Sequence, residues 1–143
     1  MDRPELQEDG IETMLSSART IAVVGLSDNP TRDSHSVGRY LQANGYRVIP
    51  VNPAVDEVLG ERAYPDLASI PDDVEIDIVD VFRRPEHVPE IVDAAIARGA
   101  RAVWMQLGVH HRDAAERARK AGLTVVENRC IKVEHARRNY PQA

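Results

Sequence analysis

Four residues at the end of the first apolar segment of the chain and just after it could hold a phosphate group. The segment TIAVVGL contains Gly25, and Ser27, Arg32 and Ser36 follow it in a turn-rich stretch that leads into a helical pattern. The first N–H groups of a helix lack partners within the helix and carry a partial positive charge, so they attract anions. Gly25 would let the backbone approach a ligand, the serines could donate hydroxyl groups, and Arg32 could add a charge-assisted contact.

The same loop has a purely structural alternative. Gly25 could only turn the chain, and Asp33 or Ser34 could only cap the helix, as these residue types often do. We favour phosphate binding because the loop follows the first strand of an alternating strand–helix pattern. In α/β sheets, nucleotide phosphates bind at that position.

The details of the pattern argue against a nicotinamide dinucleotide site. Such a site has closely spaced glycines and an acidic residue at the end of the second strand, which holds the ribose hydroxyls. Here no second glycine follows Gly25 until Gly38, and the second strand runs into Asn52 and Pro53, with Asp56 only beyond them. An NAD(P)-dependent small oxidoreductase is therefore an alternative interpretation and not the leading one.

Further candidate site residues lie at the ends of the third and fourth predicted strands. Arg83 and Arg84 follow Phe82, and guanidinium groups pair bidentately with phosphates. Their structural alternative is a solvated pair at a helix start, although the helix dipole does not favour cations there. Trp104 is expected in the core with a partner for its indole N–H. Gln106 shares its face nearer the edge where ligands bind, so we include Gln106 in the site.

Cys130 is the single cysteine of the chain. One cysteine excludes an internal disulfide and fits a reducing compartment. It follows the fifth strand, so it is expected at the ligand edge, and Arg129 and Lys132 nearby would favour its thiolate. The alternative is a small buried apolar side chain.

The elements that must position these residues alternate along the chain. Apolar spacing, glycines and prolines predict the following boundaries. Helices are expected over Glu8–Arg19, Ser34–Asn44, Pro85–Arg98, Arg112–Ala121 and Ile131–Arg138, and strands over Thr20–Leu26, Tyr46–Val51, Ile76–Phe82, Ala102–Leu107 and Leu123–Glu127. Residues 55–67 are expected to be irregular, with a helical turn near Asp66–Ser69. A polar network is one alternative for Glu127, Lys132, Glu134 and His135, and a solvated face of the last helix is the expected one.

This order predicts a Rossmann-like α/β fold: a doubly wound, parallel, five-stranded sheet in a three-layer single domain. The domain would span residues 1–143 with its core at about 20–135, and the predicted strand order is 3-2-1-4-5.

The composition excludes several classes of protein. The chain has 143 residues, 29% of them charged, with a net charge of −5 and no basic cluster, which disfavours nucleic acid and anionic membranes as partners. No apolar stretch approaches the roughly 20 residues of a membrane helix. No signal peptide pattern opens the sequence. We therefore expect a cytoplasmic protein.

Several segments together resemble the small stand-alone CoA-binding domain family, which is similar to the CoA-binding domain of succinyl-CoA synthetase and ADP-forming acyl-CoA synthetases. They are IAVVGLSDNPTRDSHSVGRYLQANGYRVIPVNP, VLGERAYPDLASIP, DIVDVFRRPEHVPEIV, GARAVWMQLGV and AGLTVVENRCIKVEH, which together run from about Thr20 to His135. The stretch Asp33–His35 departs from the expected loop, which would be less acidic.

The resemblance implies a ligand and a set of contacts. Coenzyme A would bind at the carboxyl edge of the sheet. The contacts implied are Gly25, Ser27, Arg32 and Ser36 for the pyrophosphate, Asn52 and Pro53 for the adenosine, and Phe82, Arg83 and Arg84 for the adenine and ribose end. The two arginines could also hold the 3′-phosphate that NAD lacks.

The leading interpretation is a module that binds CoA or acyl-CoA and has no evident catalytic residues of its own. The sequence leaves open whether a partner protein receives the ligand. The other alternative is an interaction domain with a vestigial nucleotide pocket. We also hypothesise that the CoA thiol reaches Cys130 and forms a mixed disulfide with it under oxidation.

Overall fold

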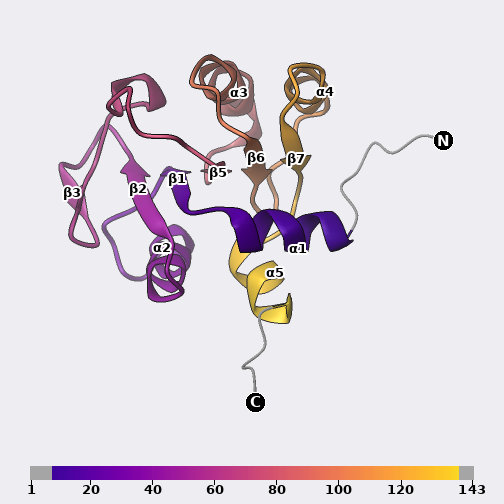
Figure 1. The fold of residues 1–143 in the computed structure, drawn as a ribbon. Coiled ribbons are helices and arrows are strands. Elements are labelled where there is room, and N and C mark those ends of the chain that lie inside the picture. Colours follow the sequence, from indigo (N-terminus) through magenta and orange to yellow (C-terminus); the bar gives the residue numbers. More distant parts are fainter. Residues whose placement is uncertain (1–7, 139–143) are drawn as a thin grey trace.

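Five parallel strands form the centre of the molecule in the computed structural model, which describes residues 8–138. The strands are β1 (Thr20–Val24), β2 (Arg47–Val51), β5 (Ile78–Val81), β6 (Ala102–Met105) and β7 (Thr124–Val126). They lie in the order β2-β1-β5-β6-β7, with every neighbouring pair parallel (Figure 1). The strand residues are almost all buried because helices cover both faces of the sheet.

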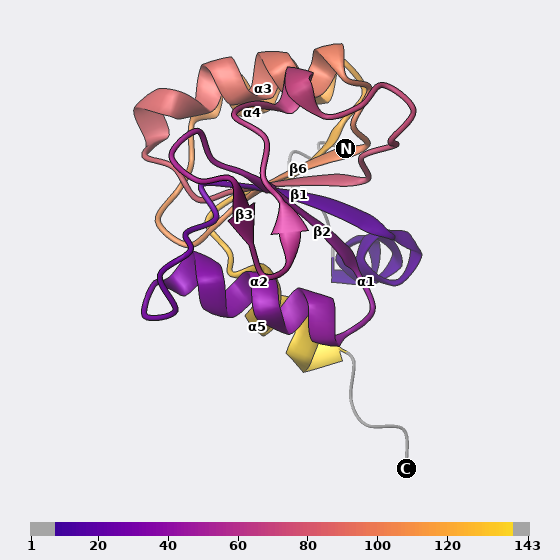
Figure 2. The ribbon, with the colours of Figure 1, turned by 90° about the vertical axis from the view of Figure 1, so that its left-hand side faces the viewer.

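The helices form a layer on each face, so the predicted three-layer α/β fold is confirmed (Figure 2). One face is covered by α1 (Glu8–Ser17), α2 (Asp33–Ala43) and α5 (Ile131–Arg138), and the other by α3 (Val88–Ala97) and α4 (Arg112–Lys120). Short 3₁₀ turns cover Leu67–Ser69 and Pro85–His87. The segment expected to be irregular also contains a small antiparallel hairpin of β3 (Glu57–Val58) and β4 (Glu61–Arg62).

The predicted strand order is wrong at one edge of the sheet. The third long strand, β5, lies beside β1 and not beside β2, so the order of the five long strands is 2-1-3-4-5 and β2 forms the edge. The physical reason is visible at Pro50, which has no N–H to donate to a further strand. Its carbonyl points outward and accepts the N–H of Tyr64 at 3.0 Å, so a loop covers this edge.

Gly25 brings the end of β1 against the end of β5. It has a φ of 91°, and a Cβ atom built on it would lie 2.3 Å from the carbonyl oxygen of Phe82. The absence of a side chain at Gly25 is therefore required by the protein's own backbone. Beyond this point the chain leaves the two strands toward opposite faces of the sheet, into α2 after β1 and into α3 after β5. Such a junction is where α/β folds bind ligands.

Gly25→Ala should destabilise the fold strongly, and Gly45→Ala is the matched control. Gly45 has a similar φ of 95°, but no atom lies within 4 Å of its Cβ position. Both variants carry the cost of a left-handed conformation, about 1–2 kcal/mol, and only Gly25→Ala adds a backbone clash. Urea unfolding should show Gly25→Ala to be less stable than Gly45→Ala by about 1–3 kcal/mol. Equal losses would mean that the backbone at Phe82 can move away without cost.

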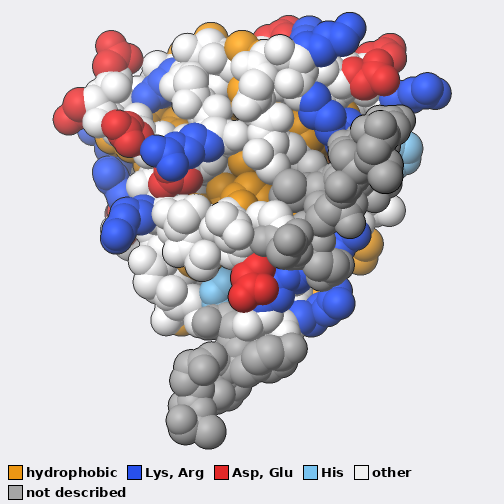
Figure 3. Space-filling model, turned by 45° about the vertical axis from the view of Figure 1, so that its right-hand side comes forward, with side chains coloured by type: hydrophobic (Ala, Val, Ile, Leu, Met, Phe, Trp, Pro, Cys, Tyr) orange, Lys and Arg blue, Asp and Glu red, His pale blue; other side chains and the backbone are white. Residues whose placement is uncertain are grey.

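Charges of both signs are interspersed on the face shown in Figure 3, and the described side chains form no broad basic area there. Within residues 8–138, no helix has the length and apolar character needed to cross a membrane. The same residues contain no group of three or more His, Cys, Asp or Glu side chains placed to hold a metal ion.

Candidate functional site

Six of the predicted site residues line one cavity of about 780 Å³ at the carboxyl ends of the strands, which we call the carboxyl-edge cavity. They are Ser36, Phe82, Arg83, Arg84, Gln106 and Cys130. The helix α2, the ends of β5 and β6, and the start of α5 supply them. Two side chains of this cavity, Leu107 and Val133, are the large hydrophobic residues that stand out as exposed among the described residues, at 71% and 52%.

The first turn of α2 faces this cavity and has no side-chain cap. Its N-cap residue is Arg32, whose side chain makes no capping hydrogen bond. Ser34 Oγ accepts the N–H of Ser27 at 3.0 Å instead of capping the helix. The interpretation that Asp33 or Ser34 only caps the helix is therefore wrong. Asp33 lies in the first turn and lines the cavity, so a carboxylate stands close to any anion bound there.

Lys132 is a further cation of this site, and it is not among the site residues predicted from the sequence. Its Nζ donates to Ser36 Oγ at 3.2 Å and lies 5.7 Å from the ring centroid of Tyr40. The contact joins the start of α5 to the start of α2 across 96 residues of sequence. A positive charge thus stands beside a helix N-terminus, a combination that suits a phosphate.

Gln106 connects β6 to the start of α5. Its side chain is buried, and its Oε1 accepts the N–H of Ile131 at 3.0 Å, which satisfies a free amide at the start of that helix. Cys130 precedes this helix and is half-buried in the cavity wall. Trp104 is fully buried, and its indole N–H donates to the carbonyl of Arg129 at 2.8 Å, as expected for a core tryptophan.

The two arginines differ in exposure. Arg83 is half-buried, and its Cδ lies 3.2 Å from the position that a Cβ on Gly25 would take, so it covers the junction of β1 and β5. The side chain of Arg84 is 81% exposed and pairs with Glu86 at 3.9 Å. An ion pair this exposed contributes little to stability, so the guanidinium group of Arg84 remains available for a ligand.

The other predicted residues lie outside the carboxyl-edge cavity. Asn52 and Pro53 line a separate cavity of about 400 Å³ at the end of β2. Asn52 Nδ2 donates to the carbonyl of Leu26 at 2.9 Å, and its Oδ1 accepts the N–H of Ala54, so this side chain fixes the two loops to each other.

Three residues of the first loop also line neither of these cavities. Gly25 contacts the backbone of Phe82. Ser27 Oγ accepts the N–H of Asn29, and the Ser27 carbonyl contacts Nδ1 of the buried His35 at 2.9 Å. Arg32 is exposed. The loop is thus held in shape by its own hydrogen bonds before any ligand binds.

Asp80 is a buried carboxyl that sequence analysis did not identify as unusual. It lies in β5 between Val23 of β1 and Trp104 of β6, and it is 0% exposed. Neither carboxyl oxygen has a hydrogen-bond partner among the described residues. Burial raises the pKa of Asp80 well above its usual range, which favours the neutral acid. Phe82, the next residue on this face of β5, lines the carboxyl-edge cavity.

The expectation of a solvated face on the last helix is wrong for two residues. Glu134 and His135 are each only 6% exposed. Glu134 is surrounded by Arg129, Arg137 and Arg138, with its nearest guanidinium nitrogen, from Arg138, at 2.6 Å. α5 packs this face against α2 and α1, so its polar residues fall inside the molecule.

Comparisons with known proteins identify relatives over the whole domain. A model of the family described as "CoA binding domain" matches residues 19–136. The chain is 43% identical to the uncharacterized protein YneT of Bacillus subtilis (strain 168), over 95% of this chain and 98% of that protein. It is similar to a solved structure, a hypothetical protein from Pyrococcus horikoshii OT3, with a TM-score of 0.91 and 40% identity over 98% of this chain and 100% of that one.

A part of a larger enzyme is also similar. Over 83 residues the chain is 30% identical to the ADP-forming acetate–CoA ligase II of Archaeoglobus fulgidus. The matched region covers 57% of this chain but only 12% of that enzyme. The family match covers far more than half of the chain and includes every strand of the sheet and the carboxyl-edge cavity. This protein therefore belongs to the family of CoA binding domains.

Proposed function

We propose that the protein binds coenzyme A or an acyl-CoA at the carboxyl edge of its sheet. The observation that carries this proposal is the carboxyl-edge cavity itself. An uncapped helix N-terminus, Lys132 and two arginines line this cavity. The protein also belongs to the family of CoA binding domains. Pyrophosphate and a 3′-phosphate both need such cationic groups, and the apolar side chains of this cavity suit an uncharged pantetheine arm.

The proposed contacts follow from this arrangement. The pyrophosphate binds at the start of α2, where Ser36 and Lys132 meet, with Gly25, Ser27 and Arg32 shaping the loop beside it. Phe82, Arg83 and Arg84 contact the nucleotide, and Gln106 keeps the start of α5 in place. Asn52 and Pro53 reach the adenosine only if it extends toward β2, because they line a separate cavity. That the CoA thiol reaches Cys130 stays a prediction.

The protein has no catalytic role in this proposal. It binds or presents CoA in the cytoplasm, and a partner protein could receive the ligand. The relative with ligase activity extends far beyond the matched region, which corresponds to 12% of its length. An NAD(P)-dependent oxidoreductase is less favoured, because β2 ends at Val51 without the acidic residue that holds a ribose.

CoA should raise the melting temperature of the purified protein, and NAD or NADP should not. A ligand that binds only the native state stabilises it by about 2.7 kcal/mol at a hundredfold excess over its dissociation constant. For a domain of this size that corresponds to a shift on the order of 10 °C. The measurement is a thermal melt with each nucleotide at equal concentration. A shift with NADP and none with CoA would contradict the proposal.

CoA should bind about tenfold more tightly than dephospho-CoA, which lacks the 3′-phosphate. A charge-assisted hydrogen bond contributes about 1.5–3 kcal/mol, and the solvent exposure of Arg84 places the effect at the lower end. Calorimetric titration of both ligands against Arg83→Ala and Arg84→Ala isolates the contact. The responsible variant should lose affinity for CoA and keep its affinity for dephospho-CoA. Equal losses for both ligands would place the 3′-phosphate elsewhere.

A further inference from the structure

The side-chain amide of Gln106 is used by the protein on one side only. Its Oε1 accepts the N–H of Ile131 at 3.0 Å. Because a backbone N–H can only donate, the amide oxygen must face Ile131, and the amide nitrogen, Nε2, must face away from it. Nε2 makes no hydrogen bond within residues 8–138, although Gln106 is only 4% exposed.

The Nε2 atom of Gln106 opens to the carboxyl-edge cavity. Among the described residues, the fully enclosed side-chain nitrogen and oxygen atoms without a partner are the two carboxyl oxygens of Asp80. Nε2 has no partner either and is not one of these enclosed atoms, so open space lies beside it. Gln106 lines the carboxyl-edge cavity, which supplies that space. A donor in so buried a side chain normally has an acceptor, and here a ligand in the cavity can supply it.

Hydrogen bonds between neighbouring segments hold Gln106 in place. Its own N–H donates to the carbonyl of Val81 at 3.3 Å, which extends the ladder between β5 and β6. In the loop that follows, the N–H of Gly108 donates to Asn128 Oδ1 at 2.6 Å, and the N–H of Asn128 donates to the carbonyl of Val109 at 3.1 Å. Nε2 is therefore oriented before a ligand binds, so little conformational entropy is lost on binding.

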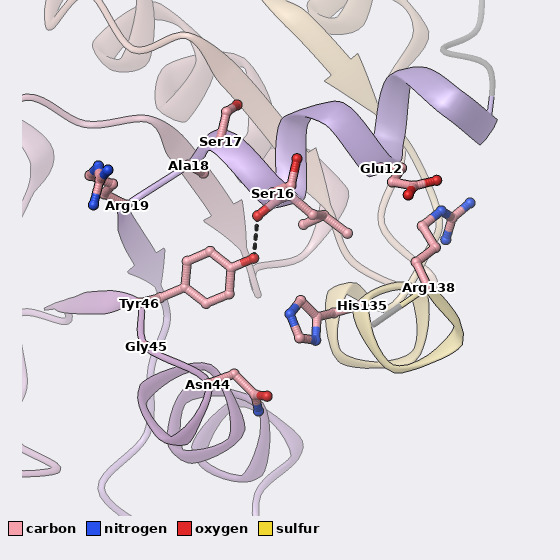
Figure 4. Close-up of a pocket in the computed structure, with 11 residues that line it drawn as sticks. Glu12, Ser16, Ser17, Ala18, Arg19, Asn44, Gly45, Tyr46, His135 and Arg138 are labelled. Atoms are coloured by element: carbon pink, nitrogen blue, oxygen red, sulfur yellow. Dashed lines mark hydrogen bonds between the residues drawn. The ribbon is translucent and has the colours of Figure 1, made fainter. Parts of the chain in front are cut away.

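The opposite end of the sheet has a cavity of about 410 Å³, but its polar groups are arranged differently. Arg19 and His135 stand on opposite sides of the Tyr46 ring (Figure 4). The hydroxyl of Tyr46 donates to the carbonyl of Leu15, so it is already used. A small ligand there would meet separate groups, whereas the carboxyl-edge cavity presents an oriented donor that the described residues leave unused.

The surroundings of Nε2 suit an uncharged part of a ligand. Phe82 and Gln106 directly follow the last residues of β5 and β6, which pair with each other, so they are neighbours at the strand ends. Leu107 and Val133 line the same cavity and are largely exposed. The Nζ of Lys132 lies at the start of α2 instead. The cavity thus has a cationic part at α2 and an apolar part at the end of β6.

A thioester carbonyl matches this apolar part better than an amide of the pantetheine arm. An amide has an N–H beside its carbonyl, so it needs an acceptor as well as a donor, whereas a thioester carbonyl needs a donor only. Gln106 offers only a donor, because its oxygen is already used by Ile131. The side chains of Phe82, Leu107 and Val133 contain no acceptor.

We propose that the protein binds acyl-CoA in preference to free CoA, because Nε2 of Gln106 donates a hydrogen bond to the thioester carbonyl. The acyl group then lies against Leu107 and Val133 and removes their exposed apolar surface from water. This inference rests on the proposed function, in which the pyrophosphate lies at the start of α2, after β1. β6 is two strands away from β1, roughly 10 Å, and the pantetheine arm spans that distance.

The test compares acetyl-CoA with S-ethyl-CoA, a thioether that carries a CH₂ group in place of the carbonyl. Calorimetric titration at pH 8 gives a dissociation constant for each ligand. The ratio of the two constants isolates the carbonyl oxygen, because effects on the shared part of the ligands cancel. The native protein should bind acetyl-CoA about two- to tenfold more tightly, which corresponds to one neutral hydrogen bond.

Two variants of Gln106 remove the donor. Gln106→Glu keeps an oxygen for the N–H of Ile131 and replaces Nε2 by a second oxygen, and Gln106→Met has a similar shape without either polar atom. The preference for acetyl-CoA should disappear in both variants, measured below their melting temperatures. Gln42→Glu is the matched control. Gln42 lies outside the lining of the cavity and donates to the carbonyl of Leu59, so the ratio should stay at its native value.

Several results would overturn the inference. Equal binding of acetyl-CoA and S-ethyl-CoA by the native protein would show that the carbonyl has no donor. A preference that persists in both Gln106 variants would assign the carbonyl to another group. A loss in these variants that is the same for free CoA, acetyl-CoA and S-ethyl-CoA would assign Gln106 to the shared arm. If the native protein binds none of the three ligands, the proposed function fails as well, so the two failures are distinguishable.

Discussion

Ser36→Asp should abolish CoA binding in a protein that remains folded. In the native protein the Oγ of Ser36 accepts from Lys132 at 3.2 Å, beside the uncapped first turn of α2. A carboxylate at this position would pair with Lys132 and occupy the helix N-terminus in place of the pyrophosphate. The loss of a charge-assisted contact, about 1.5–3 kcal/mol, adds to the loss of the helix dipole, about 0.3–1 kcal/mol. Calorimetric titration should therefore show affinity reduced by about twentyfold to eight hundredfold.

Two further variants, Ser36→Ala and Asp33→Asn, separate the effect of charge on CoA binding from the effect of shape. Ser36→Ala removes only the hydroxyl and should cost much less affinity than Ser36→Asp. Asp33→Asn removes the acid that already lines the cavity and should tighten CoA binding by about two- to fivefold. The melting temperature of Ser36→Asp should be kept, because an acid near a helix N-terminus stabilises the helix. Unchanged CoA affinity in folded Ser36→Asp would place the pyrophosphate away from α2.

The sequence was sufficient to predict the strands and their layers, because short apolar runs between glycines and helical patterns have few other solutions. It was less informative about which strand lies beside which. Pro50 was the available signal, since a strand that pairs on both sides rarely contains proline. The hairpin of β3 and β4 was missed because it has only two residues in each strand and turns through Leu59, a non-glycine residue with a positive φ of 57°.

The candidate site was predictable where residues follow the strands directly, as Phe82 and Gln106 do, or lie in the short loop between a strand and the next helix, as Cys130 does. Lys132 was not predicted as a site residue, because nothing local in the sequence shows that the start of α5 meets the start of α2, 96 residues away. His135 was misjudged for a related reason. A short polar helix at the end of a chain has the composition of a solvated surface, and only its packing against α2 and α1 buries one face.

Asp80→Leu should make the protein more stable, by about 2–4 kcal/mol at pH 8. The carboxyl of Asp80 is completely buried, and both oxygens lack partners among the described residues. Its surroundings include Val23 and Trp104, so an apolar side chain fits the chemistry of the site. Urea unfolding of the two proteins measures the difference in the free energy of unfolding.

The pH dependence of this gain has a definite sign. Burial raises the pKa of Asp80 above its value in the unfolded chain, about 3.9. The native protein therefore keeps a proton that the unfolded chain releases, and its stability falls as the pH rises from about 4 toward the raised pKa. Asp80→Leu removes this slope, so its advantage should be smaller at pH 4 than at pH 8.

Asp77 is the matched control for Asp80, because it lies just before the same strand and its carboxylate has partners. It accepts the backbone N–H groups of Arg19 at 2.9 Å and of Thr20 at 3.0 Å. Asp77→Leu should therefore destabilise the protein, by about 1–3 kcal/mol, as two backbone donors lose their acceptor. A loss of stability in Asp80→Leu as well would show that Asp80 has a partner, such as a buried water. If Asp80→Leu is more stable but binds CoA more weakly, the carboxyl of Asp80 supports the carboxyl-edge cavity. Phe82, two residues further along the chain, lines that cavity.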